Sequence, residues 1–246
     1  MEITKERYSL VTPVNCSLSY LCERDMPAIK NKQYFTKKLL AWNSVQNNRS
    51  MPWKGEKDPY KIWLSEIILQ QTQVVQGLNY YIKFTEHFPT VNDLANAPED
   101  KVMRLWQGLG YYSRARNLHA AAKTVKANYK GKFPNTYESI KELKGIGDYT
   151  AAAISSFAFN LPYAVVDGNV YRVLSRLFNI DTPINSTQGK KDFQLLANEL
   201  LNHKQPGLHN SAIMEFGALW CKPQNPKCED CPLQAQCLAF QNKTYL

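Results

Sequence analysis

The sequence predicts an all-α protein that carries a metal centre near its C-terminal end. Apolar residues recur at helical spacing along most of the chain, and no segment shows the strict alternation that marks a β-strand. Four of the six cysteines crowd into the stretch 221–237. Cysteines gathered in this way are typical of a metal site rather than of disulfides scattered through a secreted protein.

The composition narrows the class of protein further. The 246 residues include 30 Lys and Arg against 21 Asp and Glu, a formal net charge of +9. An excess of this kind favours a polyanionic partner such as nucleic acid. The N-terminal residues lack the apolar segment of a signal peptide, and no apolar run is long enough to span a bilayer. We therefore expect a soluble protein of the cytoplasm, with no membrane partner. A monomer is the expected state, although the sequence has no feature that indicates it.

The expected elements follow the chain in order. Residues 1–30, with Cys16 and Cys22, are weakly patterned and are interpreted as an N-terminal extension. An amphipathic helix is expected over 31–47, followed by a polar loop. Further boundaries are expected where proline and glycine punctuate the pattern: Pro59 and Pro98 at helix starts, Gly108 or Gly110 at a helix end, and a capping box of Asn135 and Glu138 before a helix reaching Leu143.

Residues 143–150, Leu-Lys-Gly-Ile-Gly-Asp-Tyr-Thr, form a short turn before the apolar helix AAAISSFAF. Gly145 and Gly147 permit backbone angles that a side chain would forbid, so their bare N–H groups can approach an anion at the start of the next helix. Gly-x-Gly alone favours a plain helix–turn–helix connection that uses glycine to turn tightly. The capped helix before it and the small-residue helix after it favour a hairpin that grips DNA phosphates, with Lys141 and Lys144 as basic neighbours.

The cysteine segment contains Cys221, Cys228, Cys231 and Cys237, separated by six, two and five residues. A zinc ribbon pairs two Cys-x-x-Cys knuckles, and only one is present. The unequal gaps favour a [4Fe–4S] cluster over zinc. Disulfides or free thiols are the remaining alternatives.

Two carboxylates stand out as candidate catalytic groups. Glu66 lies in an apolar helical stretch, 62–74, where lost hydration would raise its pKa and keep it protonated as a general acid. A surface glutamate is the alternative interpretation, but the polar run Gln70–Gln73 follows directly. Asp167 precedes an amphipathic helix and suits an N-cap, where the helix start favours a negative charge. One neutral and one ionised carboxyl group are the pattern of a glycosidase.

Taken together, WLSEIILQQTQV, GLGYYSRARNLH, LKGIGDYTA, VDGNVYRV and the four cysteines closely resemble the MutY family of adenine DNA glycosylases. More broadly they resemble the endonuclease III branch of the helix-hairpin-helix glycosylases, over Lys32–Ala239. The resemblance implies two lobes with a flipped base held between them. These are a six-helix barrel at 51–161 containing the hairpin at 136–159, and an iron–sulfur domain built from 31–50 and 162–246.

The resemblance also implies roles for individual residues. Glu66 matches the acid that protonates the departing purine, and Asp167 the carboxylate that stabilises the cationic sugar. Tyr149 stands where bifunctional relatives carry a lysine nucleophile, so we expect a monofunctional hydrolase. Asn169 is implied to support this centre, and Glu215 to order it. Gln70, Gln71 and Tyr111 are implied to contact the duplex. Gly145 and Gly147 are implied to bind its phosphates.

Three functions remain open at this point. The first is excision of adenine opposite 8-oxoguanine or guanine, with double-stranded DNA containing a mismatched or oxidised pair as partner. Full-length MutY-like proteins carry a further C-terminal domain that recognises the oxidised guanine, and this chain stops soon after Cys237. The second is therefore a thymine glycosylase for G·T mismatches, since such relatives also carry tyrosine at the Tyr149 position. The third is a non-catalytic iron–sulfur sensor of mismatches or redox state.

Overall fold

The computed structural model describes residues 32–244, so the expected extension 1–30, with Cys16 and Cys22, lies outside the described residues. Within the described part every regular element is helical, which confirms the all-α prediction. The helices are α2 (Lys32–Val45), α3 (Pro59–Ile68), α4 (Val74–His87), α5 (Val91–Asn96), α6 (Glu99–Trp106), α7 (Tyr112–Tyr129), α8 (Tyr137–Lys141), α9 (Asp148–Phe159), α10 (Gly168–Phe178), α11 (Thr187–Leu200), α12 (Pro206–Leu219), the 3₁₀ helix η1 (Gln234–Gln236) and α13 (Leu238–Gln241).

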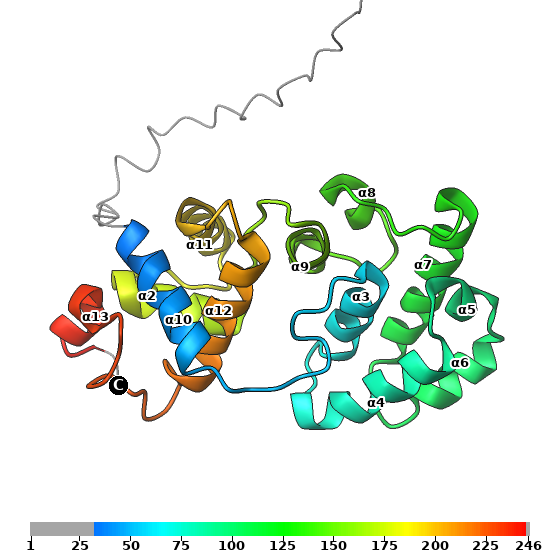
Figure 1. Ribbon diagram of the computed structural model, residues 1–246, viewed down its shortest axis with the longest axis horizontal. Coiled ribbons are helices and arrows are strands. Elements are labelled where there is room, and N and C mark those ends of the chain that lie inside the picture. Colours follow the sequence, from blue (N-terminus) through cyan, green and yellow to red (C-terminus); the bar gives the residue numbers. More distant parts are fainter. Residues whose placement is uncertain (1–31, 245–246) are drawn as a thin grey trace, which may run out of the picture. The chain divides into compact units, whose positions relative to one another are not determined.

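The helices pack in two groups. Helices α3 to α9 follow one another along the chain and pack together, while α2 packs with α10 to α13, which come from the other end of the sequence (Figure 1). Contacts between α9 and α12 join the groups. The expected division into a barrel at 51–161 and an iron–sulfur domain built from 31–50 and 162–246 stays a prediction.

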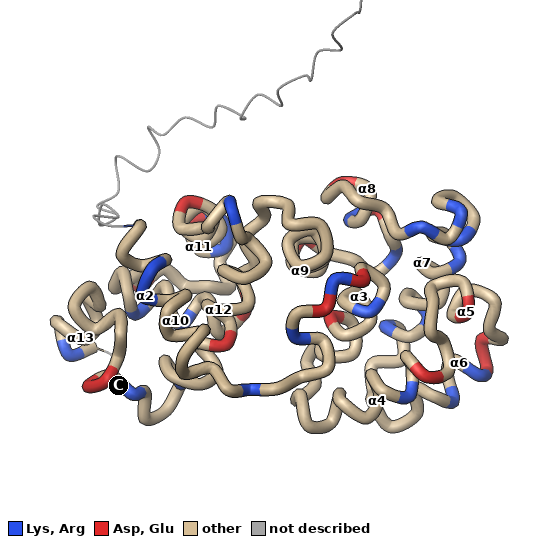
Figure 2. Tube along the Cα trace, viewed as in Figure 1, with Lys and Arg blue, Asp and Glu red and all other residues tan. Residues whose placement is uncertain are grey.

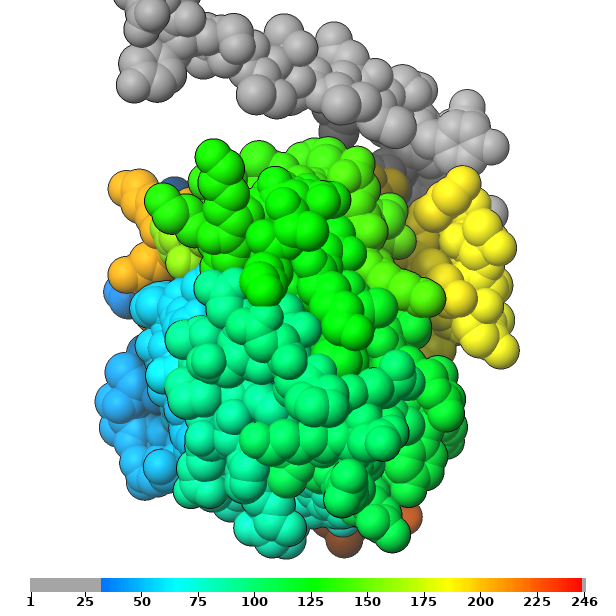
Figure 3. Space-filling view, turned by 90° about the vertical axis from the view of Figure 1, so that its right-hand side faces the viewer, coloured from blue at the N-terminus to red at the C-terminus, as the bar shows by residue number. Residues whose placement is uncertain are grey.

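The group α3–α9 is organised around large aromatic side chains. Trp63 of α3 and Trp106 of α6 are completely buried, and Trp106 packs edge-on against Phe84 with ring centroids 5.6 Å apart. Figure 3 views the molecule from the side of this group, whose helices, cyan to green, cover the face toward the viewer. Burying aromatic rings of this size fixes α3, and with it Glu66, against the rest of the group.

The group containing α2 has a core of its own. Phe35, Leu39 and Trp42 form the buried face of α2, and the Trp42 ring meets that of Phe216 on α12 at 5.0 Å between centroids. The expected helix at 31–47 is thus confirmed, ending at Val45. Because α2 packs against α12, the chain must cross between the groups twice, once through the 46–58 loop and once before α10.

Several helix ends follow the sequence pattern. Helix α3 begins at Pro59. Asp58, the residue before it, caps the helix by accepting a hydrogen bond of 2.9 Å from the Tyr60 backbone N–H. Helix α6 starts after Pro98 and ends at Trp106, and Gly108 then adopts a left-handed φ of +93°. Proline at a helix start and glycine past its end thus mark these boundaries as expected.

Two expected boundaries were wrong. The cap of α8 is Thr136, whose hydroxyl accepts from the Ser139 backbone N–H, so Asn135 and Glu138 form no capping box and the helix ends at Lys141. Helix α3 ends at Ile68 instead of continuing to residue 74. Gln71, in the polar run that follows, takes a left-handed φ of +54°, so the helix does not continue through that run.

No helix in the described range 32–244 is both long and apolar enough to cross a membrane. Lys and Arg occur on both groups of helices and on the loop that joins α2 to α3 (Figure 2). The positive charge expected from the composition is therefore spread across both groups.

Candidate active site

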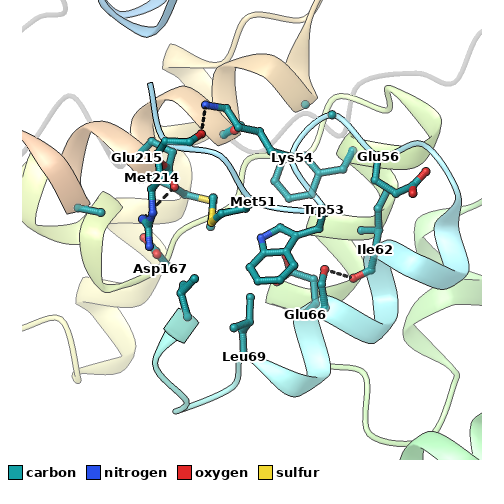
Figure 4. Close-up of a pocket in the computed structure, with 18 of the residues that line it drawn as sticks. Met51, Trp53, Lys54, Glu56, Ile62, Glu66, Leu69, Asp167, Met214 and Glu215 are labelled. Atoms are coloured by element: carbon teal, nitrogen blue, oxygen red, sulfur yellow. Dashed lines mark hydrogen bonds and ion pairs between the residues drawn. The ribbon is translucent and has the colours of Figure 1, made fainter. Parts of the chain in front are cut away.

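A pocket of about 700 Å³ lies where the two groups of helices meet. Its wall comes from both groups: α3 and α9 on one side, the start of α10 and helix α12 on the other, with the 46–58 loop beside them (Figure 4). The size is that of a pocket for a small organic group. The pocket is lined by the residues expected at the catalytic centre, which are Glu66, Tyr149, Asp167, Asn169 and Glu215. Gln70 and Gln71, expected against the duplex, line it as well.

Glu66 reaches the pocket from the last turns of α3. Ile62, one turn earlier, and Leu69, just past the helix end, line the same wall. In Figure 4 the indole of Trp53 lies beside the Glu66 carboxyl group. Burial raises the pKa of Glu66 from 4.5 to about 7, against the opposing effect of a hydrogen bond from Tyr149, and the nearby charge of Asp167 raises it further. Glu66 can therefore hold a proton near neutral pH, as a general acid must.

Tyr149 stands on the first turn of α9 and donates its hydroxyl to the Glu66 carboxyl group. Burial, together with the charges of Glu66 and Asp167, raises the pKa of Tyr149 well above its usual range. The phenol consequently stays protonated and acts as a hydrogen-bond donor. No amine occupies its position, so the tyrosine cannot form a Schiff base.

Asp167 is the N-cap of α10, as the sequence predicted. One carboxylate oxygen accepts from the Val170 backbone N–H at 2.8 Å, and the other accepts from the Asn169 side-chain amide, also at 2.8 Å. Both hydrogen bonds hold the carboxyl group in place at the start of α10. The Asp167 charge acts on Glu66 across the pocket. The site therefore holds two carboxyl groups in unlike surroundings.

Arg172 connects Asn169 to the cysteine segment. Its guanidinium donates to the Asn169 side-chain oxygen at 2.9 Å, to the Gly217 carbonyl at 2.7 Å and to the Cys221 carbonyl at 2.8 Å. A Cβ atom on Gly217 would lie 2.7 Å from the Cβ of Asn169, so only glycine lets α12 pass this close to the start of α10. The Asp167 side of the pocket is thus tied to the chain just before the first cysteine.

Sequence reasoning missed the residues that shape the pocket between the two carboxyl groups. Met51, Trp53 and Met214 place apolar side chains there (Figure 4). An aromatic residue and a methionine inside an otherwise polar loop, NNRSMPWKGEKDPY, were the available signal for the first two. Met214 looks like any apolar residue of a buried helix and gave no signal.

Glu215 forms the far end of the pocket and was expected only to order the site. Its Oε1 accepts from Arg49 at 3.3 Å. Its Oε2 is buried and has no hydrogen-bond partner among the described residues. Burial raises the pKa of Glu215, although Arg49 and Lys54 oppose the effect. A buried polar atom left without a partner is costly, so its position at a pocket wall suggests a bound group that completes the hydrogen bond.

The hairpin lies outside the pocket, between α8 and α9. Gly145 has a left-handed φ of +84°, as expected, but Gly147 has φ −98° and ψ −177°, an extended conformation open to any residue. The prediction that both glycines need special backbone angles was therefore wrong for Gly147. Lys141 is not a free cation, because it pairs with Asp148 at 2.5 Å.

Tyr111 and Gln71 stand out as exposed side chains on strained backbone. Tyr111 is 63% exposed and has φ +47°, and Gln71 is exposed with φ +54°. Gln70 and Gln71 reach the pocket wall, whereas Tyr111 does not line it. Left-handed residues other than glycine occur where the surrounding structure imposes them.

The four cysteines of the C-terminal segment come together. Burial raises the pKa of the Cys231 thiol to about 12, and the nearby charges of Cys221, Cys228 and Cys237 raise it further. None of the four forms a disulfide within the described part of the chain. No three His, Cys, Asp or Glu side chains within residues 32–244 close around one point as a single metal ion requires. Four mutually interacting thiols are the donor set that an iron–sulfur cluster requires.

Comparison with protein families yields two matches. A family model described as an HhH-GPD superfamily base excision DNA repair protein matches residues 64–200. A second, the iron-sulfur binding domain of endonuclease III, matches residues 221–237, which begin and end at the outer two cysteines. The resemblance noted from the sequence and the [4Fe–4S] cofactor are thereby confirmed.

Curated relatives agree with this assignment. The chain is 42% identical to an adenine DNA glycosylase from Buchnera aphidicola over 85% of this chain and 59% of that protein. It is also 42% identical to an adenine DNA glycosylase from Homo sapiens, over 84% of this chain and 39% of that one. The chain thus spans less than two thirds of the length of these relatives.

Solved structures show the same fold. A thermostable thymine-DNA glycosylase superposes with a TM-score of 0.79 at 29% identity, covering 87% of this chain and 98% of that one. A trapped endonuclease III–DNA covalent intermediate superposes with a TM-score of 0.71 at 20% identity, covering 86% and 98%.

Proposed function

This chain belongs to the HhH-GPD superfamily of base excision DNA repair proteins, and from that premise we propose that it is a monofunctional DNA N-glycosylase. Its proposed reaction is hydrolysis of the N-glycosidic bond of a mispaired adenine opposite 8-oxoguanine or guanine. The observation that carries the proposal is the pairing of Glu66, with its pKa raised to about 7, and the hydrogen-bonded Asp167 in one pocket.

Glu66 is the proposed general acid. An adenine leaving as an anion is a poor leaving group, so a proton delivered to the base must accompany bond cleavage. A carboxyl group with a pKa of about 7 is partly protonated at neutral pH and can deliver one. The Tyr149 hydroxyl, which donates to this carboxyl group, then stabilises the carboxylate left after the transfer.

Asp167 is the proposed stabiliser of the positive charge that develops on the sugar. Its two hydrogen bonds, from Val170 and Asn169, hold the carboxylate in place before the reaction begins. A fixed negative charge lowers the barrier because no reorganisation is needed as the cation forms. With Tyr149 in place of an amine, water completes the reaction and no strand cleavage through a Schiff base is expected.

The end of the pocket at Glu215 favours adenine over thymine. Its buried Oε2 lacks a partner within the described structure. The exocyclic amino group of adenine can donate a hydrogen bond to such an oxygen. The exocyclic polar groups of thymine are carbonyl oxygens, which cannot donate, and its base offers only the ring N3–H as a donor. The apolar side chains of Met51, Trp53 and Met214 provide surfaces on which a planar base can pack. The names of the curated relatives point the same way.

Double-stranded DNA with a mispaired or oxidised base is the proposed partner, bound by a monomer in the compartment that holds the DNA. Gly145 and Gly147 lie in the hairpin between α8 and α9, where backbone N–H groups can meet phosphates. Gln71 and Tyr111 are exposed and are proposed to enter the duplex where the base leaves. Cys221, Cys228, Cys231 and Cys237 are the proposed ligands of the cluster, which orders the segment after α12.

Thymine excision from G·T pairs is the second candidate. It is favoured by the TM-score of 0.79 to a thymine-DNA glycosylase, a structure that this chain covers almost completely. A non-catalytic mismatch sensor would need neither Glu66 nor Asp167 in the pocket, and it is the least supported of the three.

Single-turnover excision on duplexes containing A·8-oxoG, A·G, T·G and U·G distinguishes these functions. We expect release of adenine from the first two. Release of thymine or uracil alone would establish the second candidate, and tight binding without any release would establish the sensor.

Two variants test the assigned chemistry. Glu66→Gln and Asp167→Asn should each abolish excision while leaving DNA binding intact, and a rate close to that of the wild type in either variant would disprove its role. Asp58→Asn is the matched control, because Asp58 also caps a helix but does not line the pocket. Asparagine caps a helix as well as aspartate does, so both Asp→Asn variants should fold.

A further inference from the structure

Gln71 and Tyr111, the two exposed residues proposed to enter the duplex, share one unusual feature. Both have a left-handed backbone, with φ +54° and +47°, and neither is glycine. L residues rarely hold this conformation unless surrounding contacts impose it. Some group must therefore fix these two turns, which lie 40 residues apart in the chain.

Arg114, in the first turn of α7, makes the contacts that fix the first turn. Its Nη1 donates to the carbonyls of Ile67 at 3.0 Å, Ile68 at 3.1 Å and Gln70 at 2.6 Å. The first two carbonyls belong to the last turn of α3, directly after Glu66, and the Gln70 carbonyl comes directly before Gln71. A cation at this position also complements the negative end of the helix dipole.

The same side chain holds the second turn. Its Nη2 donates to the carbonyls of Leu109 at 3.3 Å and Gly110 at 3.4 Å, immediately before Tyr111. The guanidinium also lies over the Tyr111 ring, 5.4 Å from its centroid, and over the buried ring of Trp106 at 5.3 Å. One planar group thus holds both backbone turns and one of the two exposed side chains.

Only arginine suits this arrangement. Its rigid fork presents donors in two directions at once, whereas a lysine ammonium is a single point charge on a flexible stem. Lysine at this position could hold one turn through its charge, but it could not donate to both sets of carbonyls and stack on the aromatic rings at the same time.

We propose that Arg114 is a positioning residue that holds the Gln71 and Tyr111 turns as one rigid unit, fixed to the end of the helix that carries Glu66. The inference rests on the proposed glycosylase function and deepens it. Entry of the two side chains into the duplex is then coupled to the placement of Glu66 against the extruded base. Arg114 touches neither the base nor the sugar in this scheme.

The test compares Arg114→Lys with Arg116→Lys. Arg116 lies on the same helix and is largely exposed, and among residues 32–244 it makes only a surface ion pair with Glu99 at 4.0 Å. It is therefore the matched control. We expect Arg114→Lys to retain helical circular dichroism and cluster absorbance. Its single-turnover excision rate at saturating enzyme should fall at least about tenfold, as the loss of charge-assisted hydrogen bonds implies. The enzyme concentration for half-maximal rate should change far less, and Arg116→Lys should match the wild type.

Base extrusion is read separately, from the fluorescence of 2-aminopurine at the target position. The increase seen on binding of the wild type should be diminished in Arg114→Lys. A double-mutant cycle on the excision rate distinguishes this role from a general effect of Arg114 on the fold. If Arg114 acts through the two turns, its replacement should add little in a Gln71→Ala, Tyr111→Ala background.

Full additivity in that cycle, or an unchanged rate in Arg114→Lys, would overturn the inference. Should Arg114→Lys fail to fold, Gly110→Ala serves instead. A Cβ there meets no atom within 4 Å, so the substitution strains only the φ of +76° that aims the Gly110 carbonyl at Arg114. A wild-type rate in Gly110→Ala would then overturn the inference. Absence of excision by the wild type on every duplex would instead refute the proposed function.

Discussion

The proton on Glu66 makes the pH dependence of excision a direct test of the active site. With a pKa of about 7, the carboxyl group is about 90% protonated at pH 6 and about 10% protonated at pH 8. If Glu66 is the general acid, the single-turnover rate should fall about tenfold between these values. The fall should continue tenfold per unit above pH 8.

Tyr149→Phe is the perturbation that assigns this titration to Glu66. The Tyr149 hydroxyl donates to the Glu66 carboxyl group and lowers its pKa against the larger effect of burial. A hydrogen bond to a charged group contributes about 1.5–3 kcal/mol, so its removal should move the descending limb to higher pH by on the order of one unit. The variant should therefore be slower than the wild type at pH 6 but lose less of its rate by pH 8.

The measurement is a set of single-turnover rates from pH 5.5 to 9 at constant ionic strength, with DNA binding followed in parallel. Tyr163→Phe is the control, since Tyr163 packs against Tyr137 with ring centroids 4.4 Å apart and does not line the pocket. A flat profile between pH 6 and 8 in the wild type would refute the role of Glu66. A limb that moves to lower pH in Tyr149→Phe would refute the hydrogen-bond argument.

Three further outcomes are expected. Gly217→Ala places a Cβ 2.7 Å from that of Asn169, so it should lower the excision rate. It should also lower the free energy of unfolding by about 1–3 kcal/mol, seen as a lower melting temperature. Arg172→Met removes the hydrogen bonds to Asn169 and to the Cys221 carbonyl, so loss of cluster absorbance in air should accelerate together with a fall in rate. Glu66→Gln should stabilise the protein at pH 8 by at most about 3 kcal/mol, the cost of a pKa raised from 4.5 to about 7. In the wild type that cost develops as pH rises from 4.5 to 7, because the unfolded chain releases the Glu66 proton at lower pH than the folded protein does. Chemical denaturation at pH 4 should therefore give the same free energy of unfolding for the variant and the wild type.

Neighbouring residues in the sequence were enough to predict the two carboxyl groups of the site, although the site lies between two groups of helices. Asp167 was placed as an N-cap from the residues around it, and the structure shows the bond from Val170. Capping depends on a few neighbouring residues, so the sequence displays it. The position of Glu66 in an apolar stretch likewise indicated a raised pKa before any neighbour across the pocket was known.

Contacts between distant segments could not be predicted in the same way. Arg114 is an ordinary basic residue in the sequence, yet it donates to carbonyls more than 40 residues earlier. Nothing near it in the sequence indicates those partners. The end of α3 at Ile68 was missed for the same reason, because the polar run after it continues a plausible helix and the turn is held from α7.

The two carboxyl groups of the site depend on different parts of the molecule. Glu66 is fixed by α3, whose core lies among α3–α9, and its raised pKa comes mainly from burial there. Asp167 is fixed by the start of α10, whose Arg172 and Arg176 donate to backbone carbonyls of the cysteine segment. Disturbing that segment should therefore displace Asp167 and leave Glu66 in place. A protein altered in this way would keep a protonated acid against the base but lack the charge that stabilises the sugar cation, and it should bind DNA without releasing the base.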